Sequence, residues 1–233
     1  MERTLSKLTT YPGNGQMADS LPLTISGRTR KVYDALSLVY PMSTFFFHSK
    51  AHQCAMEMSG IRDGMRVLEV ATGSGEMFHR LVTANPSGST VGLDLSPNMA
   101  ARTQRMVRRK FPHSRTQCKA VDARYMPFRD ESFDAVMCCY LLELLSSDDI
   151  VVTLQEIHRV LRRRGAFTLV LIGQNTEFFN HAYKVCGSLA PAFWGRQVEA
   201  RVPELIESLD FRITGDRTLR QGFYPSRVLT ARR

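Results

Sequence analysis

The sequence predicts an α/β protein with a seven-stranded, mainly parallel sheet and an antiparallel strand at one edge. Two observations carry this prediction. First, short apolar runs of strand length alternate with segments of helical periodicity over most of the chain, which is typical of a parallel sheet with crossover helices. Second, the last two runs, residues 212–220 and 224–232, leave no room for a helix between them, so we expect them to pair as antiparallel neighbours.

The N-terminal part of the chain is expected to lie outside this sheet. Residues 1–26 show little periodicity and contain several prolines and glycines, which predicts a loose arm. Apolar residues in 28–58 recur at helical spacing, and Pro41 divides this stretch into two helices. The expected parts are an arm with a helical lid, a main domain, and an aromatic cap inserted in that domain: 1–58, 59–233 and 175–196.

The main domain contains the alternating elements. Ser96 and Pro97 are residue types typical of an N-cap and a first helical position, so a helix is expected to start there. Gly165 is expected to end the turn before the fifth strand. The expected strands are 66–70, 90–94, 116–120, 133–139 and 167–172, and the expected helices are 76–84, 97–110, 150–161 and 198–209.

Length and composition exclude several classes of protein. A chain of 233 residues favours one domain, or one domain with an added cap. With 43% hydrophobic and 23% charged residues, the chain is not disordered, collagen-like or a disulfide scaffold. The apolar runs are too short to span a bilayer, and the charged N-terminus does not resemble a signal peptide. Five cysteines, an odd number, predict buried free thiols in a reducing compartment, so the expected location is cytoplasmic.

The formal net charge is +9, and much of the excess lies in 102–115 and 158–164. One interpretation is an anionic partner: nucleic acid, an anionic membrane surface or an acidic substrate. The other is a solvated basic face without a partner, and the sequence leaves both open.

A cofactor site is expected where the first strand meets its helix. The loop Ala71-Thr72-Gly73-Ser74-Gly75 lets the backbone approach a ligand, and Asp94 ends the next strand, where a carboxylate suits ribose hydroxyls. Phe78 stands where a dinucleotide fingerprint needs a third small residue, and the lysine of a phosphate-binding loop is absent. Glu69, just before the loop, would repel a pyrophosphate but suits a cationic amino-acid moiety. These features indicate S-adenosylmethionine.

Five stretches in register extend this interpretation over about residues 60–175: Val67-Leu68-Glu69-Val70-Ala71-Thr72-Gly73-Ser74-Gly75, Gly92-Leu93-Asp94-Leu95-Ser96-Pro97-Asn98-Met99, Val121-Asp122-Ala123-Arg124-Tyr125-Met126-Pro127-Phe128, Ser132-Phe133-Asp134-Ala135-Val136 and Glu156-Ile157-His158-Arg159-Val160-Leu161. With them the sequence resembles class I S-adenosylmethionine-dependent methyltransferases. The resemblance is to the small-molecule and lipid branch that includes ubiquinone/menaquinone C-methyltransferases and phosphatidylethanolamine N-methyltransferases. It implies a Rossmann-like fold, with S-adenosyl-L-methionine as cofactor and S-adenosyl-L-homocysteine as product.

The resemblance also implies roles for single residues. Glu69 and the glycine loop would hold the methionine part of the cofactor, and Asp94 would bind the ribose. Leu95 and Met99 would flank the adenine, and Asp122 would accept from its amino group. The implied cofactor-binding set is Tyr33, Tyr40, Glu69, Ala71, Thr72, Gly73, Gly75, Asp94, Leu95, Asn98, Met99, Asp122, Ala123, Cys139 and Tyr140. Two departures from the family pattern bear on this set: Ala71 replaces the first glycine, and Arg124 stands where an acidic residue is common.

A general base is needed only if the acceptor loses a proton on methylation. The expected catalytic residues are Tyr140, His48 and His181, with His52 and Glu143 as further candidates. His48 and His52 are four residues apart on an expected helix, but no third ligand follows at metal-binding spacing, so no metal site is expected.

The acceptor is expected to contact the aromatic cap, because an apolar pocket suits a hydrophobic or ring-bearing molecule. The cap aromatics are Phe178, Phe179, His181, Tyr183, Phe193 and Trp194. This favours a small lipophilic acceptor, quinone-like or a phospholipid head group, and peripheral contact with an anionic membrane. The alternatives are a methyltransferase acting on RNA or another nucleic acid, and a cofactor-binding partner subunit without activity. Against nucleic acid, Cys139-Tyr140-Leu141-Leu142 lacks the Asn/Asp-Pro-Pro-aromatic motif of many base methyltransferases.

Overall fold

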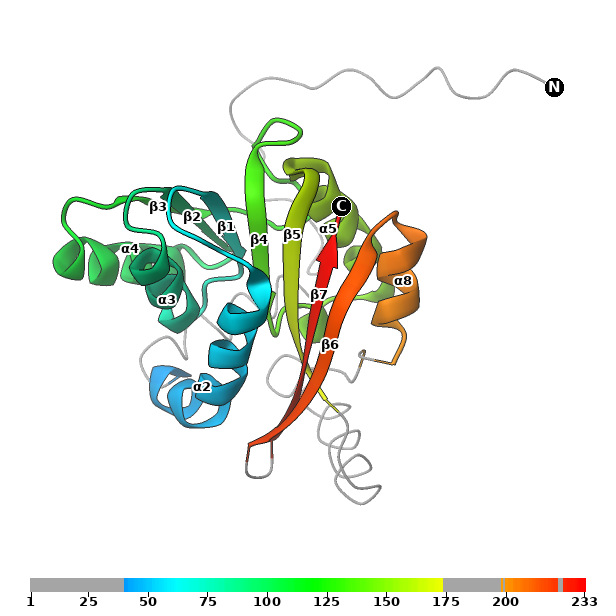
Figure 1. Ribbon diagram of the computed structural model, residues 1–233. Helices are drawn as coiled ribbons and strands as arrows, with labels where there is room; N and C mark the ends of the chain where they lie inside the picture. The colour runs from blue at the N-terminus through cyan, green and yellow to red at the C-terminus, as the bar shows by residue number, and fades with distance from the viewer. Residues whose placement is uncertain (1–39, 174–197, 199, 222–223) are drawn as a thin grey trace, which may run out of the picture.

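A computed structural model describes residues 40–173, 198, 200–221 and 224–233 (Figure 1). The expected N-terminal arm, the first lid helix and the aromatic cap lie outside the described residues. The expected division of the chain into lid, main domain and cap therefore stays a prediction.

The sheet has seven strands in the order β3-β2-β1-β4-β5-β7-β6. The first five are parallel, while β7 is antiparallel to both of its neighbours, β5 and β6. The predicted fold class and the predicted antiparallel pairing of the last two strands are thus confirmed, with β7 inserted one place in from the edge. The strands are β1 Arg66–Val70, β2 Ser89–Asp94, β3 Arg115–Ala120, β4 Phe133–Cys139, β5 Leu161–Ile172, β6 Arg212–Gln221 and β7 Tyr224–Arg232.

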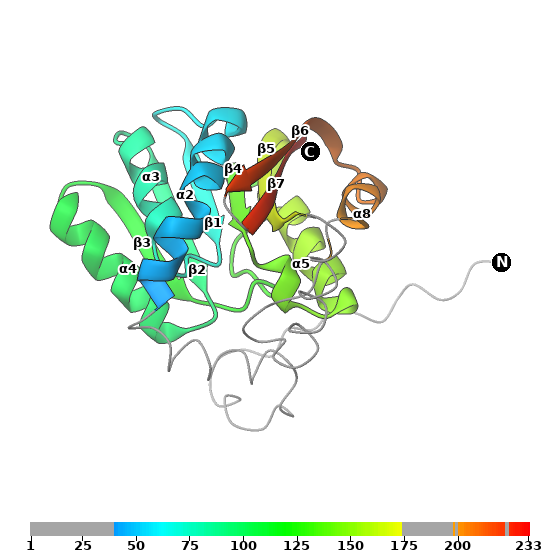
Figure 2. The same cartoon turned by 90° about the horizontal axis from the view of Figure 1, so that it is seen from below.

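Helices cover both faces of the sheet (Figure 2). Buried residues of α2 and α3 share a hydrophobic cluster, and α3 and α4 share another, so these three helices lie on one face. Buried residues of α5 and α8 share the main cluster on the opposite face. The helices are α2 Tyr40–Ser59, α3 Glu76–Ala84, α4 Pro97–Lys110, η1 Leu142–Leu144, α5 Ser147–Val160 and α8 Val202–Ser208.

Local signals explain where several helices begin. Pro41 lies in the first turn of α2, where a missing N–H costs nothing. Ser96 caps α4 by accepting a hydrogen bond from the amide of Met99 at 3.3 Å, as its residue type predicts. Ser146 does the same for α5, accepting from the amide of Asp149 at 3.1 Å, so α5 starts three residues earlier than expected.

The fifth strand is longer than its apolar core. It begins at Leu161 rather than at residue 167, because Leu161 pairs with Phe133 of β4 across an irregularity in the register. Gly165, expected in a turn, lies within β5, where a Cβ would come 2.7 Å from the Leu161 side chain. The amide of Arg164 also binds the carbonyl of Arg233, which extends the sheet past the apolar run.

A glycine on β2 sets how closely α3 approaches the sheet. The ring of Phe78 on α3 is fully buried, and a Cβ at Gly92 would lie 2.9 Å from its Cε2 atom and 2.5 Å from Cγ2 of Thr72. Close helix–sheet packing is therefore achieved by a small residue on the strand rather than on the helix.

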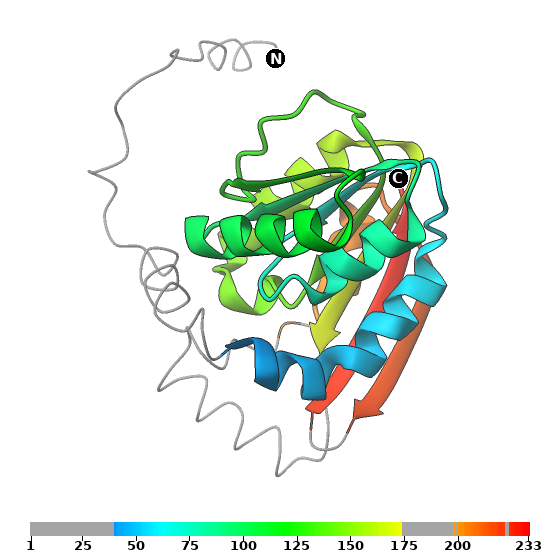
Figure 3. The ribbon, with the colours of Figure 1, turned by 90° about the vertical axis from the view of Figure 1, so that its left-hand side faces the viewer.

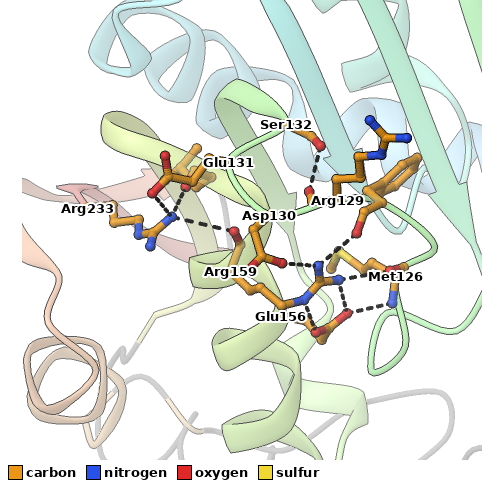
Figure 4. A network of polar contacts seen from close by, with 10 residues as sticks. Met126, Arg129, Asp130, Glu131, Ser132, Glu156, Arg159 and Arg233 are labelled. Carbon is orange, nitrogen blue, oxygen red and sulfur yellow. Dashed lines mark hydrogen bonds and ion pairs between the residues drawn. The ribbon is translucent and has the colours of Figure 1, made fainter. Parts of the chain in front are cut away.

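Arg159 on α5 holds the connection between β3 and β4 in place (Figure 4). Its guanidinium donates to the carbonyls of Met126 and Phe128, at 2.9 and 2.7 Å. It also binds both oxygens of Glu156, at 2.6 and 2.8 Å, and Asp130 at 2.8 Å. Glu156 in turn accepts from the amide of Met126 at 2.7 Å. Met126, Phe128 and Arg159 in these sequence motifs therefore form a structural network.

Replacing Arg159 with Lys is expected to lower the free energy of unfolding by about 1–3 kcal/mol, since a lysine cannot supply these planar, paired donors. Denaturation in urea measures the effect. The matched control is Arg163→Lys, because Arg163 is 88% exposed and lies 3.7 Å from Glu131, so its loss should cost less than about 0.5 kcal/mol. Equal losses in the two variants would contradict the structural role of Arg159.

Candidate functional site

The loop between β1 and α3 takes a left-handed backbone at three of its five residues. Ala71, Gly73 and Gly75 have φ values of 66°, 47° and 82°. A Cβ at Gly75 would lie 2.8 Å from Oγ1 of Thr103, so glycine is required there for space as well as conformation. Ala71 adopts the same conformation at a cost of about 1–2 kcal/mol, which a glycine would avoid. The loop thus keeps the glycine-type shape despite the alanine.

Asp94, at the end of β2, fixes that loop. Its Oδ2 accepts from the amide of Gly73 at 2.7 Å and lies 3.4 Å from the hydroxyl of Thr72. Its Oδ1 accepts from the amide of Ser96 at 2.9 Å. The carboxylate therefore joins the β1–α3 loop to the start of α4, at the carboxyl edge of the sheet, where α/β proteins bind ligands.

Glu69, on the inner strand β1, is a buried carboxyl group that is only 1% exposed. Burial raises its pKa well above the usual value, and the neighbouring Asp94 and Glu76 raise it further. Its Oε2 accepts no hydrogen bond from the described residues. A buried carboxyl group with an unused oxygen is costly unless a cationic partner binds it. The site therefore fits the positively charged amino-acid part of S-adenosylmethionine.

In the part of the site that is predicted to contact the adenine, an arginine binds Asp122. Arg124 binds both carboxylate oxygens of Asp122 at 2.6–3.1 Å and donates to Asp149 on α5 at 2.7 Å. The unusual Arg124 thus supplies a positive charge between two acidic groups. Among the other residues expected there, Met99 is buried, Leu95 is half-buried and Asn98 is exposed.

Tyr140, which follows β4, contributes a neutral hydroxyl group. Its φ is 53°, and its oxygen lies 2.7 Å from Oγ of Ser226 on β7. Burial raises the pKa of Tyr140 well above its usual value, so the phenol stays protonated at neutral pH. It can therefore donate a hydrogen bond but is a poor base. Burial likewise raises the pKa of the neighbouring Cys139 thiol, which makes it unreactive.

His52 on α2 lies between Tyr140 and the start of α3. Its ring centroid is 6.0 Å from that of Tyr140, and its Nδ1 lies 3.3 Å from Oε2 of Glu76. Arg80 binds the other oxygen of Glu76 at 3.0 Å and Oγ of Ser49 on α2 at 3.3 Å. These contacts connect α2 directly to the residue that follows the glycine loop.

The structure brings together most, but not all, of the residues expected at the site. Tyr33 and His181 lie outside the described residues, and Tyr40 and His48 lie on α2 but their side chains are not described. Sequence reasoning missed Glu76, whose only signal was its place directly after Gly75. Glu143 is buried and accepts from the amide of Ile172 at 2.6 Å, which is a structural contact.

The four described cysteines are free. Within the described residues, no three His, Cys, Asp or Glu side chains gather to hold a metal ion. The same part of the chain contains no helix with the length and apolarity needed to cross a membrane.

With this fold and site, the chain carries a class I S-adenosylmethionine-dependent methyltransferase domain and is an S-adenosylmethionine-dependent methyltransferase. Residues 67–165 match the family model described as "Methyltransferase domain". The cofactor supplies the methyl group that the enzyme transfers.

The named relatives are distant. The demethylmenaquinone methyltransferase of Bacillus velezensis is 26% identical over 182 residues, which is 77% of each chain. The 2-phytyl-1,4-naphtoquinone methyltransferase of Nostoc is 27% identical over 143 residues, covering 59% of this chain and 62% of the relative. Among solved structures, the magnesium protoporphyrin IX methyltransferase of Synechocystis with bound SAH has a TM-score of 0.63 at 17% identity, covering 95% of this chain and 90% of that one. This last likeness shows the fold alone.

Proposed function

We propose that this methyltransferase acts on a small lipophilic acceptor of the quinone type. The relatives that support this are named as methyltransferases of quinones, and they match over much of the chain. The aromatic residues of the cap, predicted from the sequence, have the chemistry to bind an apolar ring.

The observation that carries the proposed cofactor site is the buried carboxyl group of Glu69 with its unused oxygen. Glu69 and the glycine loop bind the cationic methionine part. Asp94 binds the ribose hydroxyls while it holds the amide of Gly73. Asp122, positioned by Arg124, accepts from the adenine amino group, with Leu95 and Ala123 beside it.

Methyl transfer needs the acceptor held in line with the methyl group and water kept out. The neutral hydroxyl of Tyr140 orients an acceptor oxygen by donating a hydrogen bond. His52 is placed beside Tyr140 and Glu76, which is the arrangement of a base with a carboxylate that orients it. His48 and His181 remain candidates for the same role.

The test is transfer of label from methyl-labelled S-adenosylmethionine into a cell extract, which is then separated into organic, aqueous and nucleic-acid fractions. The expected result is label in the organic fraction, with a product whose mass identifies a methylated quinone-type compound. A heat-denatured sample of the enzyme is the control. Label confined to nucleic acid or to an aqueous small molecule would overturn the lipophilic acceptor.

A further inference from the structure

One side of the molecule holds most of its net charge. Residues 97–120, which form α4, β3 and their connection, are called here the α4–β3 face. The face contains seven basic residues and no Asp or Glu, while the rest of the chain contains 24 basic and 22 acidic residues. The seven are Arg102, Arg105, Arg108, Arg109, Lys110, Arg115 and Lys119.

Five of these seven charged side chains are exposed. The buried residues of α4 are Met99, Ala100, Thr103 and Val107, and they face the sheet. Arg105 and Arg108–Lys110 lie on the exposed side of the helix, and Arg115 is exposed on β3. β3 is an edge strand of the sheet, and α4 lies beside it at that end of the molecule (Figures 1 and 3).

Part of this face has no carboxylate partner among the described residues. By contrast, Arg124, Arg159 and Arg227 each bind a carboxylate at 2.6–2.7 Å. Arg105, Arg108 and Arg109, among the described residues, form no ion pair. Arg115 donates to the carbonyl of Ser87, and Lys110 and Lys119 lie over the rings of Phe111 and Phe128, at 5.9 and 5.6 Å.

Like charges brought close together repel one another, and α4, at 14 residues, is only about 21 Å long. Because salt screens charges over about 8–10 Å, neighbouring residues of the face act on an approaching anion together. The arrangement is therefore suited to an extended, negatively charged surface.

We propose that the α4–β3 face docks the enzyme on an anionic lipid bilayer, a proposal that rests on the lipophilic acceptor proposed above. The exposed cationic side chains of this face attract anionic lipid headgroups. The face exposes no Phe, Tyr or Trp of its own on which nucleic-acid bases would stack.

The test is flotation of the full-length enzyme with lipid vesicles. The wild type is expected to float with vesicles containing phosphatidylglycerol but not with phosphatidylcholine alone, and salt should weaken binding. The variant Arg105→Gln/Arg108→Gln/Arg109→Gln should bind the anionic vesicles about 100-fold more weakly, since each basic residue near the surface contributes several-fold. Glutamine keeps helix propensity, and equal melting temperatures would confirm that the variant folds.

The matched control is Arg62→Gln/Arg129→Gln/Arg201→Gln, which removes the same charge from three exposed arginines outside the face. This control should bind vesicles within about twofold of the wild type. Equal loss in both triple variants, no flotation of the wild type, or equal binding to neutral vesicles would overturn the docking face. So would wild-type binding to a single-stranded RNA without binding to vesicles.

The flotation experiment and the methyl-transfer experiment test the two proposals independently of each other. If the enzyme does not float but label enters the organic fraction, the docking proposal is wrong and the proposed acceptor class stands. If it floats and the triple variant does not, while label goes elsewhere, the face is a lipid-binding surface and the acceptor class is wrong.

Discussion

Replacing Asp94 with Ala is expected to weaken binding of S-adenosylhomocysteine by about 1–3 kcal/mol, which is roughly 5–150-fold in the dissociation constant. The physical reason is double. The carboxylate is the proposed partner of the ribose hydroxyls, and its Oδ2 also holds the amide of Gly73 at 2.7 Å, so its loss loosens the loop that binds the methionine part. Isothermal titration calorimetry measures the effect.

A second ligand separates the two causes. The analogue of S-adenosylhomocysteine that lacks the 2′-hydroxyl group should bind the wild type more weakly, but should lose little further affinity in Asp94→Ala. Asp94→Asn keeps the size of the side chain and one carbonyl oxygen, so it should fall between wild type and Asp94→Ala. If removing the 2′-hydroxyl group weakens binding to Asp94→Ala as much as it weakens binding to the wild type, Asp94 does not contact the ribose directly. An unchanged affinity in Asp94→Ala would remove Asp94 from the cofactor site.

Replacing Glu69 with Gln is expected to have the largest effect on cofactor affinity, a loss of about 3–5 kcal/mol, because one member of a buried ion pair is removed while its cationic partner remains. At the same time the cofactor-free protein should become more stable at neutral pH. The two effects have opposite signs, so a variant that merely misfolds cannot imitate them. Calorimetric binding and thermal unfolding without ligand measure them.

The pH dependence of stability follows from the raised pKa of Glu69. Below the usual pKa of a glutamic acid, near 4.5, the side chain is protonated in both the folded and the unfolded state. Its ionisation therefore does not change the free energy of unfolding there. As the pH rises above that value, the unfolded chain loses the proton first while burial keeps it on the folded protein, so stability falls with increasing pH. Glu69→Gln should therefore gain stability relative to wild type between that pH and neutrality, and the difference should vanish in acid.

The matched control for Glu69 is Glu131→Gln, because the carboxylate of Glu131 is 44% exposed and its pairs with Arg163 and Arg233 are long, at 3.7 and 3.4 Å. That change should leave cofactor binding unaltered and stability within about 0.5 kcal/mol. If Glu69→Gln binds S-adenosylhomocysteine as tightly as wild type, Glu69 does not hold the cationic part of the cofactor.

Local patterns in the sequence were enough to predict the elements and their class. Strands β1, β2 and β4 are short apolar runs, and α4 is marked by Ser96 and Pro97, so each is specified by neighbouring residues alone. The type of cofactor followed in the same way, since Glu69 and the glycine loop are separated by a single residue. Nearness in the sequence guarantees nearness in space for these features.

Other features depend on residues far apart in the chain. The cap by Ser146 makes α5 begin earlier than its apolar residues indicate. The pairing of Leu161 with Phe133 likewise makes β5 begin before its apolar run. Arg124 looked like a mere departure from a motif, but Asp149, 25 residues away, makes it a bridge that holds Asp122. The sequence did not distinguish His52 from the other candidate histidines, whereas the fold places it beside Glu76 and Tyr140.

By itself, then, the sequence determined the α/β class, the antiparallel pairing of the last strands and the S-adenosylmethionine chemistry, because each depends on periodicity or on adjacent residues. Only the tertiary structure decided which oxygen of Glu69 accepts no hydrogen bond from the described residues, which groups Asp94 joins, and that the basic residues of α4 and β3 share one face. Burial and long-range contacts set these properties, since desolvation and hydrogen bonding depend on what the folded chain places around each group.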